Sequence, residues 1–147
     1  MISYKSEALV HVTRAFFSDK TNKQAKSPVD TVSFDRASRA VRCLPFKKAF
    51  YENIKKGSIN SKELCNESAW ERFVFAPFGI SRAEDHFRWM IKLGILRREV
   101  DGQGLTDRVR LTPLGIEVIN QWRTEIPRAG LRERIQENFR RHILVGS

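Results

Sequence analysis

One segment, residues 81–122, sets the strongest limit on what this chain can fold into, because helix, strand and turn signals follow one another there with clear stops. Ser81 and Glu84 have the spacing of a capping box, so a helix is expected to begin at Ser81. Its apolar positions recur every three or four residues, at Ala83, Phe87, Met90 and Ile91. Gly94 suits the left-handed position after a last turn, which predicts a helix over residues 81–93.

Two short strands and another helix are expected after it. Residues 95–100 and 108–111 have strand-like patterns, and residues 101–104, Asp-Gly-Gln-Gly, carry the glycines that a strand-to-strand turn needs. Thr112 before Pro113 is typical of a helix cap followed by a first-turn proline, whose missing N–H would be unsatisfied anyway. The expected order is therefore helix, strand, turn, strand, helix.

This order resembles the winged helix-turn-helix superfamily of DNA-binding domains. The resemblance is carried by L-G-I-L-R-R-E-V at 93–100, a glycine-containing tip, and R-V-R-L-T-P-L-G at 108–115. The Leu-Thr-x-x-Gly turn is similar to that of bacterial transcriptional regulators. The resemblance covers roughly residues 46–126 and is more specific for fold than for function, because winged helices also serve as protein-protein modules. It implies a mainly α fold with a small β-hairpin wing (α+β).

The chain is expected to divide into three parts. These are an N-terminal extension over residues 1–45, a winged helix domain over 46–126 and a C-terminal helical extension over 127–147. Within the first part, the sequence predicts a helix over 7–17 and a polar loop over 18–30. An extended stretch at residues 32–34 and a short helix capped by Asp35 follow.

Local signals also predict the start of the domain. Its first helix is expected over residues 46–56, and residues 58–59 suit a short strand. Asn60 resembles a helix cap and would open a second helix that runs to about residue 73. Residues 74–80, V-F-A-P-F-G-I, are more aromatic than a usual helix-turn-helix turn. We expect them in the core, with a partner-binding patch as the alternative.

The charge balance favours a polyanionic partner. The chain has 27 basic and 17 acidic residues, a formal net charge of +10. Neutralised phosphates release counterions, so such an excess supports nucleic-acid binding. Residues 1–46 carry 8 basic and 4 acidic side chains, residues 47–126 carry 14 and 11, and residues 127–147 carry 5 and 2. The excess is thus spread along the chain, which also suits a generic basic surface.

Helical spacing predicts the side chains that would contact DNA on the helix over residues 81–93. The outward or flanking residues are Ser81, Arg82, Asp85, Arg88, Trp89 and Lys92. The three cations suit guanine edges or phosphates, and the helix start would present N–H groups to a phosphate. Asp85 repels phosphates unless it accepts from a cytosine amino group. Trp89 either contacts thymine methyls or is buried beneath the N-terminal segment or a partner.

The hairpin adds further candidates for DNA contact. Four arginines flank the glycine-containing tip, namely Arg97, Arg98, Arg108 and Arg110. They could reach a minor groove or the phosphate backbone. Arginines also favour exposed strands without any such role, and that alternative stays open.

An apolar stripe at four-residue spacing follows Pro127, at Leu131, Ile135, Phe139 and Ile143. Such a stripe must be buried against something. Regulators that the chain resembles often end in a helix that pairs with its copy, and a two-fold dimer would set two reading helices about one DNA turn apart. We expect a homodimer, with packing on the chain's own N-terminal helix as the alternative.

No catalytic or cofactor motif stands out, so we do not expect an enzyme. The histidines are scattered at His11, His86 and His142, and the cysteines Cys43 and Cys65 lack the spacing of a zinc site. We expect no metal, no cofactor and no membrane span, and the sequence identifies no small-molecule effector. Without a signal-peptide pattern at its start, the chain is expected in the cytoplasm.

Three functions remain as hypotheses. The leading one is a sequence-specific double-stranded DNA-binding protein, a small dimeric transcriptional regulator. The second is a protein-protein adaptor that uses Phe75, Phe78 and Trp89 as interface aromatics. The third is a non-specific nucleic-acid accessory protein of replication or a mobile element.

Overall fold

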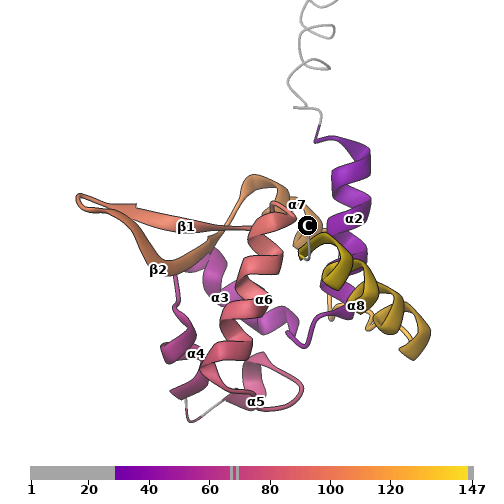
Figure 1. The fold of residues 1–147 in the computed structure, drawn as a ribbon, viewed down its shortest axis with the longest axis horizontal. Helices are drawn as coiled ribbons and strands as arrows, with labels where there is room; N and C mark the ends of the chain where they lie inside the picture. Colours follow the sequence, from indigo (N-terminus) through magenta and orange to yellow (C-terminus); the bar gives the residue numbers. More distant parts are fainter. Residues whose placement is uncertain (1–28, 67, 69, 146–147) are drawn as a thin grey trace, which may run out of the picture.

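The fold is mainly helical, with a β-hairpin between helices (Figure 1). The computed structural model describes residues 29–66, 68 and 70–145. The helix expected over residues 7–17 and nearly all of the polar loop expected over residues 18–30 lie outside the described residues. The fold class expected from the sequence is confirmed.

The elements follow one another in the order expected for residues 81–122. They are α2 (Thr31–Cys43), α3 (Lys48–Lys56), α4 (Ser61–Asn66), α5 (Trp70–Phe73), α6 (Ile80–Lys92), β1 (Leu96–Asp101), β2 (Gly104–Leu111), α7 (Pro113–Asn120) and α8 (Leu131–Val145). None of the described helices is long and apolar enough to cross a membrane.

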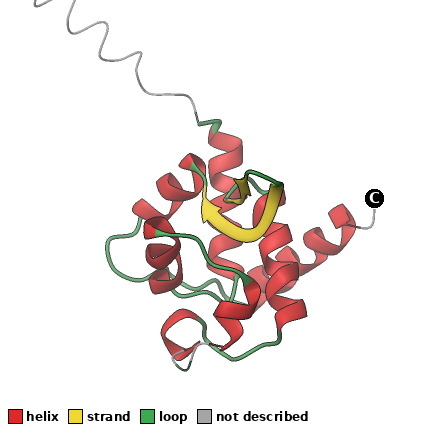
Figure 2. Cartoon of the chain, turned by 90° about the vertical axis from the view of Figure 1, so that its left-hand side faces the viewer, coloured by secondary structure: helices red, strands yellow, loops and turns green. Residues whose placement is uncertain are grey.

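Helix α6 stands in the middle of the molecule. Figure 1 shows the hairpin projecting to one side of it, with α4 and α5 near its lower end and with α2 and α8 on the opposite side. Turned by 90°, Figure 2 shows the helices gathered around the base of the hairpin. The largest fully buried side chains come from α2, α3, α4, α6, α7 and the hairpin base, and include Val41, Phe50, Ile54, Leu64, Phe87, Met90, Leu96 and Ile119.

The hairpin pairs β1 and β2 antiparallel, from Leu96 opposite Leu111 to Asp101 opposite Gly104. Ile59 forms an isolated antiparallel bridge with Val109, through hydrogen bonds of 3.2 and 2.8 Å between the two backbones. β2 therefore has a partner on each side at its inner end. The short strand expected at residues 58–59 is reduced to this single bridge at Ile59.

Residues of four elements meet where the hairpin leaves the body. Gly94 ends α6 in the left-handed region, with φ 78°, which an L side chain rarely adopts. Thr112 caps α7, because its Oγ1 accepts the N–H of Gly115 at 3.0 Å. The Ile95 carbonyl accepts from the Thr112 N–H at 3.0 Å. The cap and proline start expected at Thr112 are confirmed.

Gly115 is the residue that this junction requires. A Cβ at Gly115 would stand well inside 3.0 Å of the Ile95 carbonyl oxygen and 2.9 Å from Leu111 Cδ2. The Leu-Thr-x-x-Gly pattern therefore has a packing cause: threonine caps α7, and glycine lets the first turn of α7 touch the start of β1.

The capping box expected at Ser81 is wrong. α6 begins at Ile80, its N-cap is Gly79, and Ser81 lies in the first turn. Glu84 does not reach back to the helix start, because its carboxylate pairs with Arg98 of β1 at 2.8 Å. A charge-assisted bond to a guanidinium is stronger than a bond to a neutral backbone N–H.

The elements expected before α3 also differ. α2 begins at Thr31, because Asp30 rather than Asp35 is its cap and accepts from the Val32 N–H at 3.3 Å and the Ser33 hydroxyl at 3.0 Å. The extended stretch expected at residues 32–34 is therefore helical. α2 buries Ala37, Ala40 and Val41, and Ala37 and Val41 belong to the common hydrophobic core, so α2 packs with the residues that follow it.

The second helix expected from Asn60 to about residue 73 is split into α4 and α5. The Asn60 cap itself is confirmed, because its Oδ1 accepts the Glu63 N–H at 2.8 Å. The first helix starts at Lys48, not at Phe46, because the Phe46 backbone bridges Val74 instead. This bridge holds the end of α5 beside the start of α3.

Gly115→Ala should lower the free energy of unfolding by about 1 to 3 kcal/mol, because the added methyl forces the start of α7 away from β1. Gly102→Ala at the hairpin tip is the matched control, because a Cβ there meets nothing within 4 Å. Its change should stay within about 0.5 kcal/mol. Urea unfolding of both variants measures the difference, and equal stabilities would contradict the junction's role.

Candidate nucleic-acid interface

The outer face of α6 carries most of the side chains expected there. Ser81, Arg82, Asp85, Arg88 and Lys92 are exposed. Arg88 and Asp85 form an ion pair of 3.2 Å in which both side chains stay more than half exposed. Such pairs contribute little to stability and exchange readily with another charged partner. Arg82 forms no ion pair with any residue that the structure describes.

The expected outward position of Trp89 is wrong, because its side chain is only 3% exposed. Helical spacing assigned a single apolar face to α6, but the structure packs a second side. Trp89 lines two cavities whose other walls come from α2 and α8. Its burial within the chain excludes direct contact with thymine methyl groups in this conformation.

α8 lies against the outer face of α6. Lys92 Nζ donates to the Leu144 carbonyl oxygen near the C-terminal end of both helices. One turn earlier, Arg141 Nη1 lies 3.0 Å from His86 Nδ1. Figure 1 shows α8 running from the side of the molecule toward the upper end of α6. The face expected to read DNA is therefore shared between two helices.

The two helices enclose a groove of about 580 Å³. Its lining residues are Arg82, Asp85, His86, Arg88, Trp89, Lys92, Asn138, Arg141 and His142. Burial, together with the charges of Arg141 and Arg82, lowers the pKa of His86 to about 4. His86 is therefore neutral at pH 7, and the net charge of the groove comes from four cations and Asp85.

Reasoning from the sequence missed His86 and Arg141. A usable signal was present for His86, since it lies four residues after Arg82 and three before Trp89, which places all three on one helix face. For Arg141 there was no local signal, because its place beside α6 depends on how the C-terminal helix packs.

Arg98 is held at the base of the hairpin. Its Nη2 lies 2.8 Å from Glu84 Oε2, and its Nη1 donates to the Asp107 carbonyl at 2.7 Å. Burial alone would raise the pKa of Glu84, but hydrogen bonds from Arg98 and Ser61 lower it overall. This guanidinium ties β1 to α6 and is not directed at a ligand.

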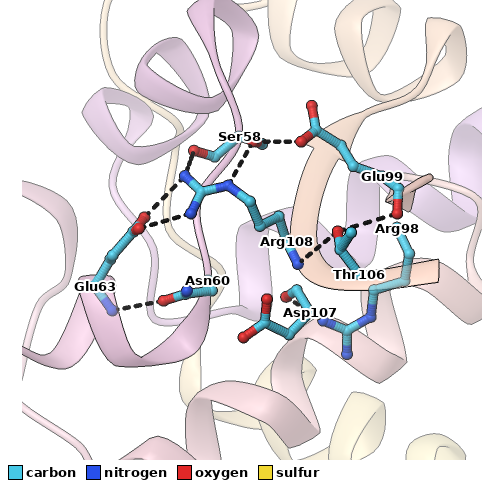
Figure 3. Close-up of polar contacts among 8 residues, drawn as sticks. All are labelled: Ser58, Asn60, Glu63, Arg98, Glu99, Thr106, Asp107 and Arg108. Carbon is cyan, nitrogen blue, oxygen red and sulfur yellow. Dashed lines mark hydrogen bonds and ion pairs between the residues drawn. The ribbon is translucent and has the colours of Figure 1, made fainter. Parts of the chain in front are cut away.

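Arg108 forms a larger clamp between β2 and the start of α4 (Figure 3). Its guanidinium contacts both carboxylate oxygens of Glu63, at 2.6 and 3.0 Å, and donates to the Ser58 hydroxyl and carbonyl at 2.9 and 2.7 Å. The hydrogen bonds from Arg108 hold the pKa of Glu63 below its usual value. The Ser58 hydroxyl in turn donates to Glu99 at 2.7 Å.

The remaining hairpin arginines differ from each other. Arg110 Nε lies 3.2 Å from Glu99 Oε1 in an ion pair whose geometry does not make a hydrogen bond. Arg97 is exposed and forms no ion pair with any residue that the structure describes. Of the four arginines expected to contact DNA, Arg97 is thus the one left available.

The distal part of the hairpin is acidic and apolar. Between Arg98 and Arg108 the chain carries Glu99, Asp101 and Asp107 and no basic residue. Val100 and Leu105 face each other across the strands and are 70% and 77% exposed. The carboxylates of this tip would repel phosphates. The expectation that the hairpin carries arginine side chains to DNA therefore lacks support at the tip.

The apolar stripe of α8 is largely exposed, with 66% of Leu131, 47% of Ile135, 66% of Phe139 and 70% of Ile143 accessible. α8 packs on the body through its polar side, from which Arg134, Glu137 and Arg141 line cavities. The alternative expectation, packing on a helix over residues 7–17, concerns residues outside those described.

Within the described residues, no group of three or more His, Cys, Asp or Glu side chains could hold a metal ion. Cys43 and Cys65 are both free thiols, and burial raises the pKa of each.

Arg108→Ala should lower the free energy of unfolding by about 1 to 2 kcal/mol, because it leaves Glu63 and Ser58 without their charged partner. Arg97→Ala removes the same charge from the neighbouring strand, where the side chain is exposed, and should change stability by less than about 0.5 kcal/mol. Urea unfolding measures both. If the two variants lose the same stability, the clamp contributes nothing specific.

His86 should make the protein less stable in mild acid. Its pKa is about 4 in the folded chain against 6.5 in an unfolded one. The unfolded state therefore takes up a proton first as the pH falls, and stability is lost between pH 6.5 and 4, by at most about 3 kcal/mol. His86→Phe keeps the ring that packs edge-on against Phe46 and Phe78 but cannot titrate.

The test compares the unfolding free energy of both proteins at about pH 7 and about pH 4.5. The loss between the two conditions should be smaller in His86→Phe. Identical losses would mean that other groups cause the whole pH dependence.

The comparison with known families gives one match. Residues 27–141 match the family described as Npun_F0494-like. No curated protein and no solved structure matches the chain. The matched range contains the hairpin, α6 and most of α8, so it includes both helices of the groove. The chain belongs to the Npun_F0494-like family.

Proposed function

We propose that this chain is a winged-helix protein that binds double-stranded DNA in a sequence-specific manner. The order α3, Ile59 bridge, α4 with α5, α6, β1 and β2 supports the winged-helix interpretation, because the bridge pairs with β2 as a short first strand would. In that arrangement α6 is the reading helix and the hairpin is the wing.

The observation that carries the proposal is the row of exposed cations on α6. Arg82 lies in the first turn of α6 and Arg88 about two turns after the helix start, both at exposed positions in the part of the helix that enters a major groove in helix-turn-helix proteins. The ion pair between Arg88 and Asp85 can open at low energetic cost, which frees the guanidinium for a guanine edge.

α8 supports the proposal through charge. Arg141 and His142 line the same groove as Arg82, Arg88 and Lys92. A phosphate backbone beside α6 would meet these side chains as well, so α8 adds to the holding of DNA. The wing contributes Arg97, whereas Arg98, Arg108 and Arg110 support the fold through their ion pairs.

We further propose that the protein is a homodimer through α8 and acts as a small transcriptional regulator. The exposed side chains of Leu131, Ile135 and Phe139 form an apolar strip on one helix, and burying such a strip is favourable. A two-fold axis would present two copies of α6 to one duplex. The expectation that the protein is not an enzyme remains a prediction, as does the expectation that it is cytoplasmic.

A protein-protein adaptor is the second candidate, and the wing tip favours it. Val100 and Leu105 are exposed among three acidic residues, a surface suited to a basic, apolar partner. The aromatic patch first expected for an adaptor has less support, because Trp89 is buried, Phe78 packs against the core, and the ring of Phe75 lies 4.3 Å from Arg128 Cζ.

The double variant Arg88→Ala, Lys92→Ala should weaken binding to the preferred duplex by roughly 2 to 4 kcal/mol, at about 1 to 3 kcal/mol for each good base contact. The duplex is first selected from random DNA at about 150 mM salt. Fluorescence anisotropy then compares the selected duplex with random DNA.

Arg36→Ala, Arg39→Ala is the matched control, since it removes the same charge from exposed positions on α2. It should leave the preference between the two duplexes unchanged. If the unaltered protein prefers no duplex, a sequence-specific function is wrong. Weak binding that salt abolishes would then favour the adaptor, and strong non-specific binding would favour a nucleic-acid accessory protein.

Leu131→Asp, Phe139→Asp should convert the dimer into a folded monomer, because the charges would be buried in the interface at a large cost. Light scattering at tens of micromolar and circular dichroism measure assembly and folding. Arg132→Asp lies between the two positions in the helix without belonging to the strip and is the control. A monomeric unaltered protein would rule out the dimer.

A further inference from the structure

A cavity of about 330 Å³ lies among α2, α6, α8 and the segment before α6. One wall is apolar and includes Ala40, Leu44, Pro77, Phe78, Trp89, Leu131 and Ile135. The other wall carries Arg82, His86, Arg134, Glu137, Asn138 and Arg141. The volume lies within the range of small-molecule sites, which combine apolar walls with a few polar groups.

This cavity opens into the groove between α6 and α8. The two share Arg82, His86, Trp89, Asn138 and Arg141, so they form one continuous concave surface. We call the two together the α6–α8 site. Leu44, Phe78 and Trp89 belong to its apolar wall, and Arg82 and Arg141 line both of its parts.

Arg141 is the most unusual side chain in the α6–α8 site. It is half-buried, and its Nη1 lies 3.0 Å from Nδ1 of the neutral His86 ring. Burial lowers the pKa of Arg141, Asp85 opposes that shift and Arg82 adds to it. No carboxylate of the described residues forms an ion pair with Arg141. A partly desolvated guanidinium beside another cation is stabilised by a bound anion.

Arg134 adds a second unsatisfied donor. Its Nε is buried and has no hydrogen-bond partner among the described residues. The acidic side chain on the same wall, Glu137, is engaged with Arg140 at 3.8 Å. The α6–α8 site thus holds guanidinium groups, those of Arg134 and Arg141, that form no ion pair with a carboxylate of the described residues.

We propose that the α6–α8 site binds a small molecule that joins one anionic group, a carboxylate or a phosphate, to an apolar body. Arg141 and Arg82, which line both parts of the site, would take the anionic group. The body would lie against the apolar wall at Leu44, Phe78 and Trp89. This inference does not rest on DNA binding, because the cavity, its apolar wall and the charge of Arg141 belong to the free chain.

A small ligand fits these observations better than a DNA phosphate alone. A phosphate of the backbone would satisfy the guanidinium groups, but it brings no apolar group to cover Leu44, Phe78 and Trp89. An amphiphilic anion satisfies both walls.

The test uses isothermal titration calorimetry of the full chain with octanoate, octyl phosphate, octanol, inorganic phosphate and a short duplex DNA. Octanoate and octyl phosphate should bind, each at least about tenfold more tightly than octanol or inorganic phosphate. The two anionic probes distinguish a carboxylate ligand from a phosphate ligand. Inorganic phosphate binding as tightly as octyl phosphate would overturn the role of the apolar wall.

Arg141→Gln should lower the affinity for the anionic probes by about tenfold or more and leave octanol binding unchanged. Arg132→Gln on the same helix removes the same charge outside the α6–α8 site and should bind as the unaltered protein does. Arg82→Gln should also weaken the binding of the anionic probes. Because Arg82 is exposed on α6, this effect does not depend on a change in how α8 packs. Circular dichroism checks that each variant is folded.

Equal affinities in Arg141→Gln, Arg82→Gln and Arg132→Gln would overturn the proposal. So would binding of the duplex alone, with neither octanoate nor octyl phosphate bound, since the guanidinium groups would then serve nucleic acid. Because the calorimetry needs no DNA, loss of DNA specificity in the unaltered protein leaves the ligand result intact.

Discussion

The close approach of α7 to the start of β1 holds the molecule together at its centre. The Ile95 carbonyl accepts from the Thr112 N–H, while the Ile95 N–H donates to the Met90 carbonyl at 2.9 Å. Gly115 makes room for this contact. The end of α6, both hairpin strands and α7 therefore share one fixed point. The direction in which the hairpin leaves the body, and its position relative to α6, follow from that point.

Ion pairing decides which of the many cations are available to a partner. Arg98, Arg108 and Arg110 lie at the hairpin base, but each faces a carboxylate of the same chain. Bidentate pairs with short distances, such as that of Arg108 with Glu63, are geometrically specific and not readily exchanged. The net charge of +10 belongs to the whole chain and therefore does not describe the hairpin, where three of the four arginines face carboxylates. Among the cations considered for DNA contact, the available ones lie on α6 and α8 and at Arg97 of β1.

Features fixed by neighbouring residues could be predicted from the sequence. The glycine stop at Gly94, the cap at Thr112, the hairpin turn and the amphipathic α8 each depend on local backbone chemistry, and each is confirmed. The cap of α2 is an exception, because the sequence predicts Asp35 there and Asp30 serves instead.

Predictions failed where a distant residue competes for a side chain. Glu84 has the spacing of a capping box, but Arg98, 14 residues away, takes its carboxylate. Glu63 is bound by Arg108, 45 residues away. The spacing of apolar residues in α6 placed Trp89 on the outward side, because that spacing does not reveal a second packing partner such as α8. The spacing of apolar residues predicts one buried face of a helix. Only the tertiary structure shows whether a second face is buried as well.

The shared lining of α6 and α8 links the two proposals made for this molecule. Arg82 and Arg141 are the groups that would meet a DNA phosphate beside α6 and also the anionic end of a small ligand. One guanidinium cannot satisfy both at full strength, so each ligand would weaken the other. By linkage the two effects must be equal in free energy, whichever molecule binds first. If both proposals hold, competition within this one groove is a physical route by which a small anion would release DNA.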